Sequence, residues 1–146
     1  MKYKLSILLL GLAPAPLLAA ESFTQSPAYK ECTALASTNP KLALEKAQAW
    51  LTLDQSTAAL HCRAMALYGD RQFELAGAAL TDVRNTIARD DITLRSFVAR
   101  QASRAWVNAN KPDAAIASLT DQITDMTDQS GDNATEARLT AELLLD

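Results

Sequence analysis

Short amphipathic segments follow one another along this chain with few residues between them, and this spacing limits the possible folds more than any other feature. One segment carries apolar residues in steps of three and four, at Phe73, Ala76, Leu80, Val83 and Ile87. Such steps place side chains on one face of an α-helix. Aromatic residues make up only 5% of the chain and alanine dominates the apolar residues, which favours closely packed helices over sheets. The sequence therefore predicts an all-α fold.

Prolines and polar turns mark where the helices begin and end. Pro27, Pro40 and Pro112 each follow a polar residue, and proline fits the first helical turn because its missing N–H would have no partner there. The pattern predicts helices over about 27–37, 56–68 and 92–109, and three more that begin at Pro40, near residue 71 and at Pro112. Connections this short join antiparallel neighbours, so we expect helical hairpins.

A seventh helix is expected near the C-terminus, over about 133–145. Glu136 lies three residues after Asn133, as in a capping box. This helix would cap the open end of the array.

The first twenty residues are typical of a secretory signal peptide, cleaved after Ala20. Two lysines precede an apolar run over residues 5–12, and small residues follow before Glu21. A membrane anchor is the alternative, but two prolines interrupt the run, which is shorter than the roughly 20 apolar residues that a spanning helix needs. The first cysteine, Cys32, lies well past the segment, so no lipid-attachment cysteine sits at the cleavage site. We expect one exported domain over 21–146, periplasmic or secreted and without stable membrane insertion.

The charge balance argues against nucleic acid as a partner. The full chain has a net charge of −3, and removal of Lys2 and Lys4 with the signal peptide changes it to −5, the wrong sign for binding phosphates. Residues 121–146 hold seven acidic residues and one basic residue, Arg138. This segment is expected to be a solvated helix end, and an acidic docking surface for a basic partner is the alternative.

The only histidine, His61, precedes Cys62 directly. Neighbouring residues on a helix point about 100° apart, so the pair cannot act together on one substrate. A metal site needs three or four convergent ligands, and the spacing of the carboxylates completes no such set. The sequence therefore predicts no enzyme, no metal and no cofactor. A processing factor that depends on a thiol or a metal at Cys62 and His61 is the less favoured alternative.

The two cysteines, Cys32 and Cys62, form an even count in an exported chain. The simplest expectation is one disulfide. Closing a loop of about 30 residues would stabilise a small domain by about 3 kcal/mol. Two buried free thiols that pack as small apolar side chains are the alternative.

A pattern recurs along the helical region. Small residues open the second helix of each pair at Ala43, Ala76 and Ala115, at intervals of 33 and 39 residues. The first interval is close to the 34-residue period of the tetratricopeptide repeat. The segments AMALYGDRQFELAGAAL and ASRAWVNANKPDAAIASL carry the likeness. The chain resembles a small exported bacterial tetratricopeptide protein with three repeats, over about 24–55, 56–90 and 91–127.

This resemblance implies a right-handed superhelical stack of antiparallel helical hairpins, with about seven helices in all. Each hairpin needs the next to bury its second apolar face. The alignment places Cys32 and Cys62 in the first helices of neighbouring repeats, where their Cβ atoms could approach within the roughly 4 Å of a disulfide. First helices of this family line a groove that holds a peptide or a partner helix. Carried over by alignment, the groove wall consists of Ala58, His61, Met65, Tyr68, Phe97, Arg100, Arg104 and Val107.

The predicted groove suggests how a partner would bind. Arg100 and Arg104 lie one helical turn apart and suit a carboxylate, and Met65 and Phe97 could receive an apolar side chain. An ordinary solvated arginine face is the alternative. The two tryptophans continue apolar stripes and are expected in the core. The resemblance thus implies a non-catalytic adaptor for a protein or peptide partner, and an accessory subunit or structural spacer of an envelope assembly is the alternative.

Overall fold

A computed structural model describes the backbone of residues 23–143 and the side chains of residues 23–127. The predicted signal peptide, residues 1–20, lies outside this range. The described chain forms a 3-10 helix and six α-helices and has no strand, so the all-α prediction is confirmed. The elements are η1 (Phe23–Gln25), α1 (Pro27–Thr38), α2 (Pro40–Leu53), α3 (Thr57–Gly69), α4 (Phe73–Thr86), α5 (Ile92–Asn108) and α6 (Pro112–Leu143).

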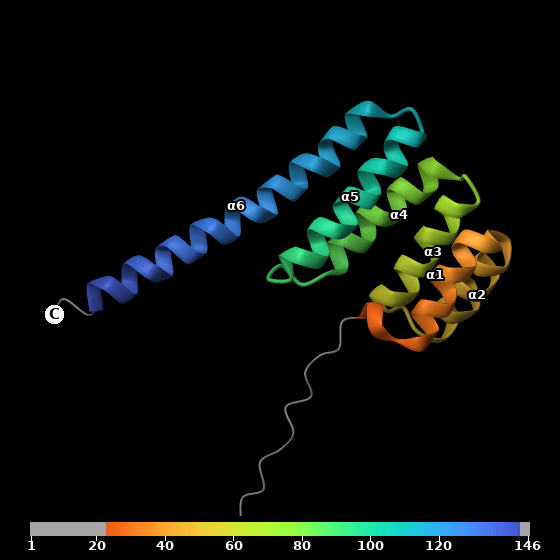
Figure 1. Ribbon diagram of the computed structural model, residues 1–146, viewed down its shortest axis with the longest axis horizontal. Coiled ribbons are helices and arrows are strands. Elements are labelled where there is room, and N and C mark those ends of the chain that lie inside the picture. Colours follow the sequence, from red (N-terminus) through yellow and green to blue (C-terminus); the bar gives the residue numbers. More distant parts are fainter. Residues whose placement is uncertain (1–22, 144–146) are drawn as a thin grey trace, which may run out of the picture.

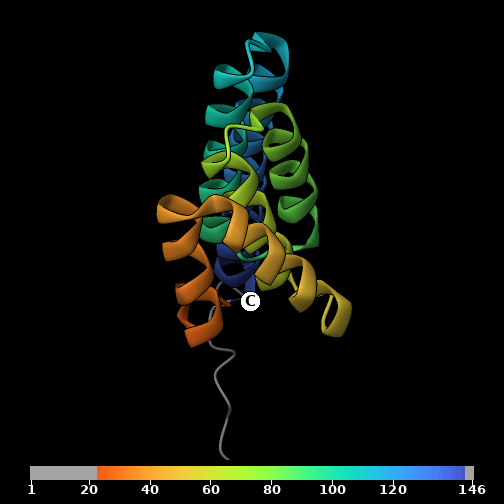
Figure 2. The same ribbon diagram turned by 90° about the vertical axis from the view of Figure 1, so that its right-hand side faces the viewer.

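The helices pack side by side in the order of the sequence, as three consecutive hairpins (Figure 1). Each α-helix contacts the next one along the chain, and α1 also packs along α3. Figure 2 shows α1 and α5 on one side of the array and α2 and α4 on the other.

Polar caps fix most of the helix starts. The side chains of Ser26, Asn39, Ser56 and Asp91 each accept a hydrogen bond from the backbone N–H three residues later. Such a cap satisfies one of the four N–H groups that a helix leaves without a partner at its start. The prolines predicted to open helices are the first residues of α1, α2 and α6.

The α3–α4 and α5–α6 turns share one geometry. Arg71 and Asn110 have positive φ angles of 60° and 57°. The next backbone N–H donates in each case to a carbonyl five residues earlier, from Gln72 to Leu67 and from Lys111 to Trp106, which is the pattern that closes many helices. Arg71 and Asn110 are 39 residues apart, the interval from Ala76 to Ala115. The α1–α2 connection differs because the single residue Asn39 joins these helices.

The main core lies between α3, α4 and α5, and smaller clusters join α1 and α2 to α3. Trp106 packs against the main core and Trp50 against the cluster around the cysteines, as expected from their apolar stripes. Gly77 makes room for Trp106, since a Cβ at residue 77 would lie 2.6 Å from the indole ring. At the end of α3, a Cβ on Gly69 would overlap the backbone oxygen of Ala36, so α1 and α3 approach closely there.

The C-terminal region differs from the prediction. Instead of one helix after Pro112 and a separate capping helix over about 133–145, α6 is one continuous helix of 32 residues. The described chain therefore has six α-helices and not seven. The helix start expected at Asn133 is not observed. No proline follows Pro112 to interrupt α6, and the glycine at position 131 costs a helix only about 1 kcal/mol. The far half of α6 projects beyond the other helices (Figure 1).

Candidate partner-binding surface

The first helices of the hairpins line a surface with two hollows. One, of about 410 Å³, lies between α1 and α3, and its lining includes Thr33, Ala36 and Ser37. The other, of about 110 Å³, lies between α3 and α5 and is lined by Leu80, Gln101 and Arg104. Met65 and Tyr68 line both hollows, so these two half-buried side chains form the ridge between them. Below, this surface is called the α3–α5 face.

The predicted groove residues of α5 are accessible. Phe97 is 41% exposed and Val107 is 63% exposed, and Arg100 and Arg104 are also exposed. Neither arginine forms an ion pair with any residue whose side chain the structure describes. The structure thus brings Met65, Tyr68 and Arg104 together around one hollow and leaves Arg100 on the same helix, one turn away.

His61 does not line the groove as predicted, because it is only 1% exposed. Its Nδ1 lies 2.8 Å from the hydroxyl of Tyr29, and its Nε2 lies 2.6 Å from Oε1 of Gln101. The rings of Phe23, Tyr29 and Phe97 lie within 6.4 Å of the imidazole, centroid to centroid. Ala58, also expected on the wall, is 6% exposed. The alignment could not show that η1, α1 and α5 cover this part of α3.

The hydrogen bonds around His61 define its protonation. Gln101 accepts at Oε1, so Nε2 of the imidazole donates, and Nδ1 accepts from Tyr29. The other end of Gln101 donates to the sulfur of Met65 at 3.5 Å, which connects the buried imidazole to the α3–α5 face. Burial lowers the pKa of His61, and the hydrogen bond to Gln101 opposes this only in part. Burial also raises the pKa of Tyr29 to about 12. Both groups are therefore neutral near pH 7, and the cluster stabilises the packing of α1, α3 and α5.

Cys32 and Cys62 form the predicted disulfide, with 5.9 Å between their Cα atoms. Both residues are buried, and the bond joins α1 to α3. The alternative of two free thiols is contradicted, since neither cysteine is free. A disulfide-bonded Cys62 has no thiolate to act as a nucleophile or as a metal ligand. Among the described side chains, no three His, Cys, Asp or Glu residues are grouped as metal ligands would be.

Two buried arginines and an aspartate form a cluster that the sequence analysis missed. Arg84 and Arg95 are 8% and 7% exposed. The Nη2 atoms of Arg84 and Arg95 lie 2.6 Å and 3.0 Å from the two carboxylate oxygens of Asp125. Arg95 also donates to the backbone oxygens of Arg84 and Ile87, at 3.2 and 3.1 Å. The cluster fastens α6 to the end of α4 and to α5.

The segment over residues 121–146 was expected to be a solvated helix end, but the Asp125 side chain is only 12% exposed, and Asp121, at 49% exposed, is paired with Arg84. Asp121 accepts from Arg84 through its side chain and its backbone oxygen, at 3.4 and 3.1 Å. Burial raises the pKa of Asp125, but hydrogen bonds and charges from Arg95 and Arg84 outweigh it and lower the pKa overall. A sequence signal for this cluster exists in α5, where Arg95 is in phase with the buried Val98 and Ala102.

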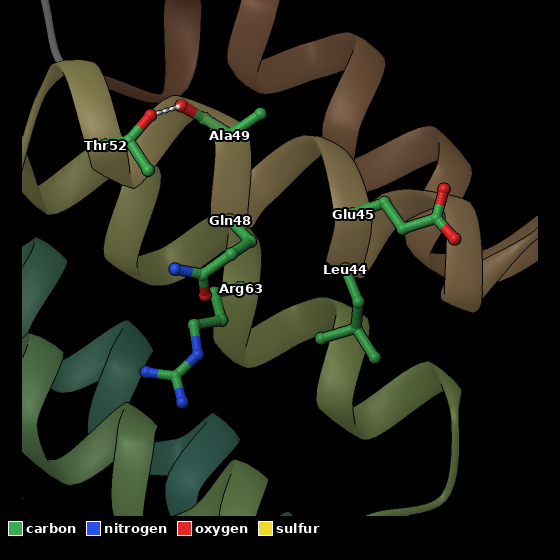
Figure 3. A pocket seen from close by; sticks show the side chains of 6 residues that line it. All are labelled: Leu44, Glu45, Gln48, Ala49, Thr52 and Arg63. Atoms are coloured by element: carbon green, nitrogen blue, oxygen red, sulfur yellow. Dashed lines mark hydrogen bonds between the residues drawn. The ribbon is translucent and has the colours of Figure 1, made fainter.

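A third hollow, of about 540 Å³, lies along α2 (Figure 3). It is lined by Leu44, Glu45, Gln48, Ala49, Thr52 and Arg63. The Thr52 hydroxyl donates to the oxygen of Ala49 at 2.6 Å, and Glu45 and Arg63 point away from each other (Figure 3). Their charges do not converge on one point, so this hollow offers no paired acid and base.

Comparisons with protein families, with curated proteins and with solved structures found no match to this chain. Within the described residues, no helix combines the length and the apolar character needed to cross a membrane.

Proposed function

We propose that this chain is an exported, non-catalytic helical-repeat adaptor that binds a protein or peptide partner on its α3–α5 face. The observation that carries the proposal is the pair of hollows divided by Met65 and Tyr68, next to two exposed arginines that have no ion-pair partner among the described side chains. Apolar side chains of a partner would enter the hollows, and Arg100 and Arg104 would bind its carboxylates by charge-assisted hydrogen bonds.

The rigid support beneath this face favours binding. The disulfide holds α1 on α3, and the chain of hydrogen bonds from Tyr29 through His61 to Gln101 joins α1, α3 and α5. A surface fixed before binding loses less conformational entropy when a partner docks. His61, as a buried neutral imidazole, serves as a positioning residue for Gln101 and Met65.

Two further features support the export and the repeat architecture in this proposal. A disulfide is typical of oxidising compartments such as the periplasm, in agreement with the secretory pattern of residues 1–20. The two matching turns at Arg71 and Asn110 are spaced as the sequence pattern is, which supports a tetratricopeptide-like stack of hairpins.

Capture in the native compartment tests the proposal. A photoreactive amino acid at Phe97 should crosslink a partner in cells, and Arg100→Glu with Arg104→Glu should abolish that crosslink by reversing the charge of the face. Arg63→Glu is the matched control, because Arg63 is an exposed arginine that lines the hollow along α2 instead. Equal crosslinking in the double variant and the control would contradict binding at the α3–α5 face.

A further inference from the structure

The first hairpin, defined here as η1, α1 and α2 over residues 23–53, is joined to the rest of the fold mainly through α3. Its two α-helices make their main contacts outside the hairpin with α3, and η1 also contacts α3. Within the hairpin, Lys46 of α2 pairs with Glu31 of α1 at 2.7 Å. The hairpin is therefore held together internally and has one main neighbour.

Small side chains make the apolar contact between the first hairpin and α3. The two buried clusters at this junction consist of Cys32, Ala47 and Cys62, and of Ala36, Ala43 and Ala66. Larger side chains such as Leu44 and Trp50 are only partly buried there. The main core between α3, α4 and α5 instead buries larger side chains, including Leu67, Leu80 and Val98. Because stabilisation by packing grows with the apolar area buried, the first hairpin is held to α3 more weakly than α3, α4 and α5 are held to one another.

The disulfide supplies a large part of this attachment. Cys32 and Cys62 are 30 residues apart in the sequence, and closing a loop of that length favours the packed state by roughly a hundredfold. The hydrogen bond from the Tyr29 hydroxyl to His61 crosses the same junction at 2.8 Å. A single neutral hydrogen bond contributes less than the covalent bond does.

The connection between α2 and α3 is suited to act as a hinge. It consists of residues 54–56, and the backbone is extended at Asp54 and Ser56. None of these three residues has the positive φ that closes the α3–α4 and α5–α6 turns at Arg71 and Asn110. Rotation about a few residues of this kind lets a packed unit move as one body.

We propose that the disulfide is a redox-sensitive link, and that its reduction lets the first hairpin open from α3 as one unit while α3, α4 and α5 stay packed. The reductant is a dithiol. One of its thiolates attacks a sulfur of the bond, and its second thiol then displaces the mixed disulfide. Two electrons and two protons thereby pass to Cys32 and Cys62, and the reductant becomes a cyclic disulfide. Since these cysteines are 3% and 0% exposed, the reductant reaches them during brief openings of the hairpin.

Opening of the first hairpin removes one of the two hollows of the α3–α5 face. The hollow between α1 and α3 takes Thr33, Ala36 and Ser37 from α1. The hollow between α3 and α5 takes no residue from the first hairpin. Reduction therefore abolishes the larger hollow and leaves the smaller one. Only the oxidised chain offers a partner the whole face, a consequence that rests on the proposed function, whereas the opening itself does not.

Hydrogen exchange followed by mass spectrometry tests the opening without any partner. The chain is compared with its disulfide intact and after reduction by dithiothreitol. Amides of α1 and α2 should exchange about a hundredfold faster after reduction, because the loop is no longer closed. Amides of α4 and α5 should keep their protection. Unchanged protection of α1 and α2, or a loss of similar size in α4 and α5, overturns the proposal.

His61 gives a second measurement, because it is the only histidine of the chain and η1 and α1 cover it. Diethyl pyrocarbonate acylates accessible imidazole nitrogens, and peptide mass spectrometry locates the adduct. In the double variant Cys32→Ala with Cys62→Ala, the rate at residue 61 should rise about a hundredfold over that of the oxidised wild type. Reduced wild type keeps both sulfurs as buried thiols, so the same exchange pattern in it and in the variant assigns the effect to the bond. An unchanged acylation rate, or lost protection of α4 and α5 in the variant, overturns the proposal.

Discussion

Asp125→Asn should be among the most destabilising single polar substitutions in this protein. The Asp125 side chain is only 12% exposed, and those of Arg84 and Arg95 are 10% and 9% exposed. The amide keeps the size of the carboxylate but removes the negative charge that both guanidinium groups face. Among the described residues, Nε of Arg95 has no hydrogen-bond partner, and Asp125 is the carboxylate that this guanidinium meets.

The expected loss is about 3 kcal/mol in the free energy of unfolding. Removing one member of a buried ion pair costs about 3–5 kcal/mol, because the other charge stays buried without a partner. The lower end applies here, since Arg84 keeps Asp121 and Arg95 keeps two backbone oxygens. About 3 kcal/mol is a large share of the 5–15 kcal/mol that stabilises a typical domain, and it should lower Tm by about 12 °C in a domain of this size.

Urea unfolding followed by far-UV circular dichroism measures this loss. Asp121→Asn is the matched control: its side chain is 49% exposed and its contact with Arg84 is 3.4 Å, so it should cost less than about 1 kcal/mol. The lowered pKa of Asp125 adds a pH test. Its stabilisation is fully present above the ordinary pKa of 3.8 and is lost as the pH falls through the lower folded-state pKa. Equal losses in the two variants would refute the assignment of the buried charge to Asp125.

Three further predictions concern stability. Burial lowers the pKa of His61 below 6.5, so the folded state resists protonation of this imidazole. The free energy of unfolding should therefore fall as the pH drops from 6.5 toward the folded-state pKa. His61→Gln should remove this pH dependence, which urea titrations at successive pH values measure. Gly69→Ala should lower the free energy of unfolding in urea by about 2 kcal/mol, because the new Cβ would overlap the backbone oxygen of Ala36. A backbone atom cannot move away as a flexible side chain can. A variant as stable as the wild type would argue against this close approach of α1 and α3. Arg71→Gly should raise the free energy of unfolding by about 0.5–1 kcal/mol, since glycine adopts the φ of 60° without the steric strain that a side chain adds. Asn110→Gly should raise it less, because asparagine tolerates this conformation. A larger gain in Tm for Asn110→Gly than for Arg71→Gly would contradict this reasoning.

The helices could be predicted because their signals are local. Ser26, Asn39 and Ser56 cap helices within three residues of themselves, and the apolar steps of three and four reflect the helical period alone. The disulfide between Cys32 and Cys62 followed from the count of cysteines and their expected compartment, and the structure confirms it.

Only part of the candidate surface could be predicted. The alignment of the first helices placed Met65, Phe97 and Arg104 on a groove wall, and the structure leaves these side chains partly or fully accessible. The same alignment put His61 on the groove wall, where the structure shows it buried, because the position of a residue on its helix does not show what covers it.

The sequence by itself determined where the helices start and which faces are apolar, because these depend on neighbours within about one helical turn. It also left one possible cysteine pair, because the chain has only two cysteines. Only the tertiary structure decided that His61 meets Tyr29 and Gln101, and that Asp125 meets Arg84 and Arg95. These partners lie 30 to 41 residues apart along the chain. Their contact depends on the angle and depth at which whole helices pack, and those follow from the combined fit of many side chains, such as Gly69 against Ala36 and Gly77 against Trp106.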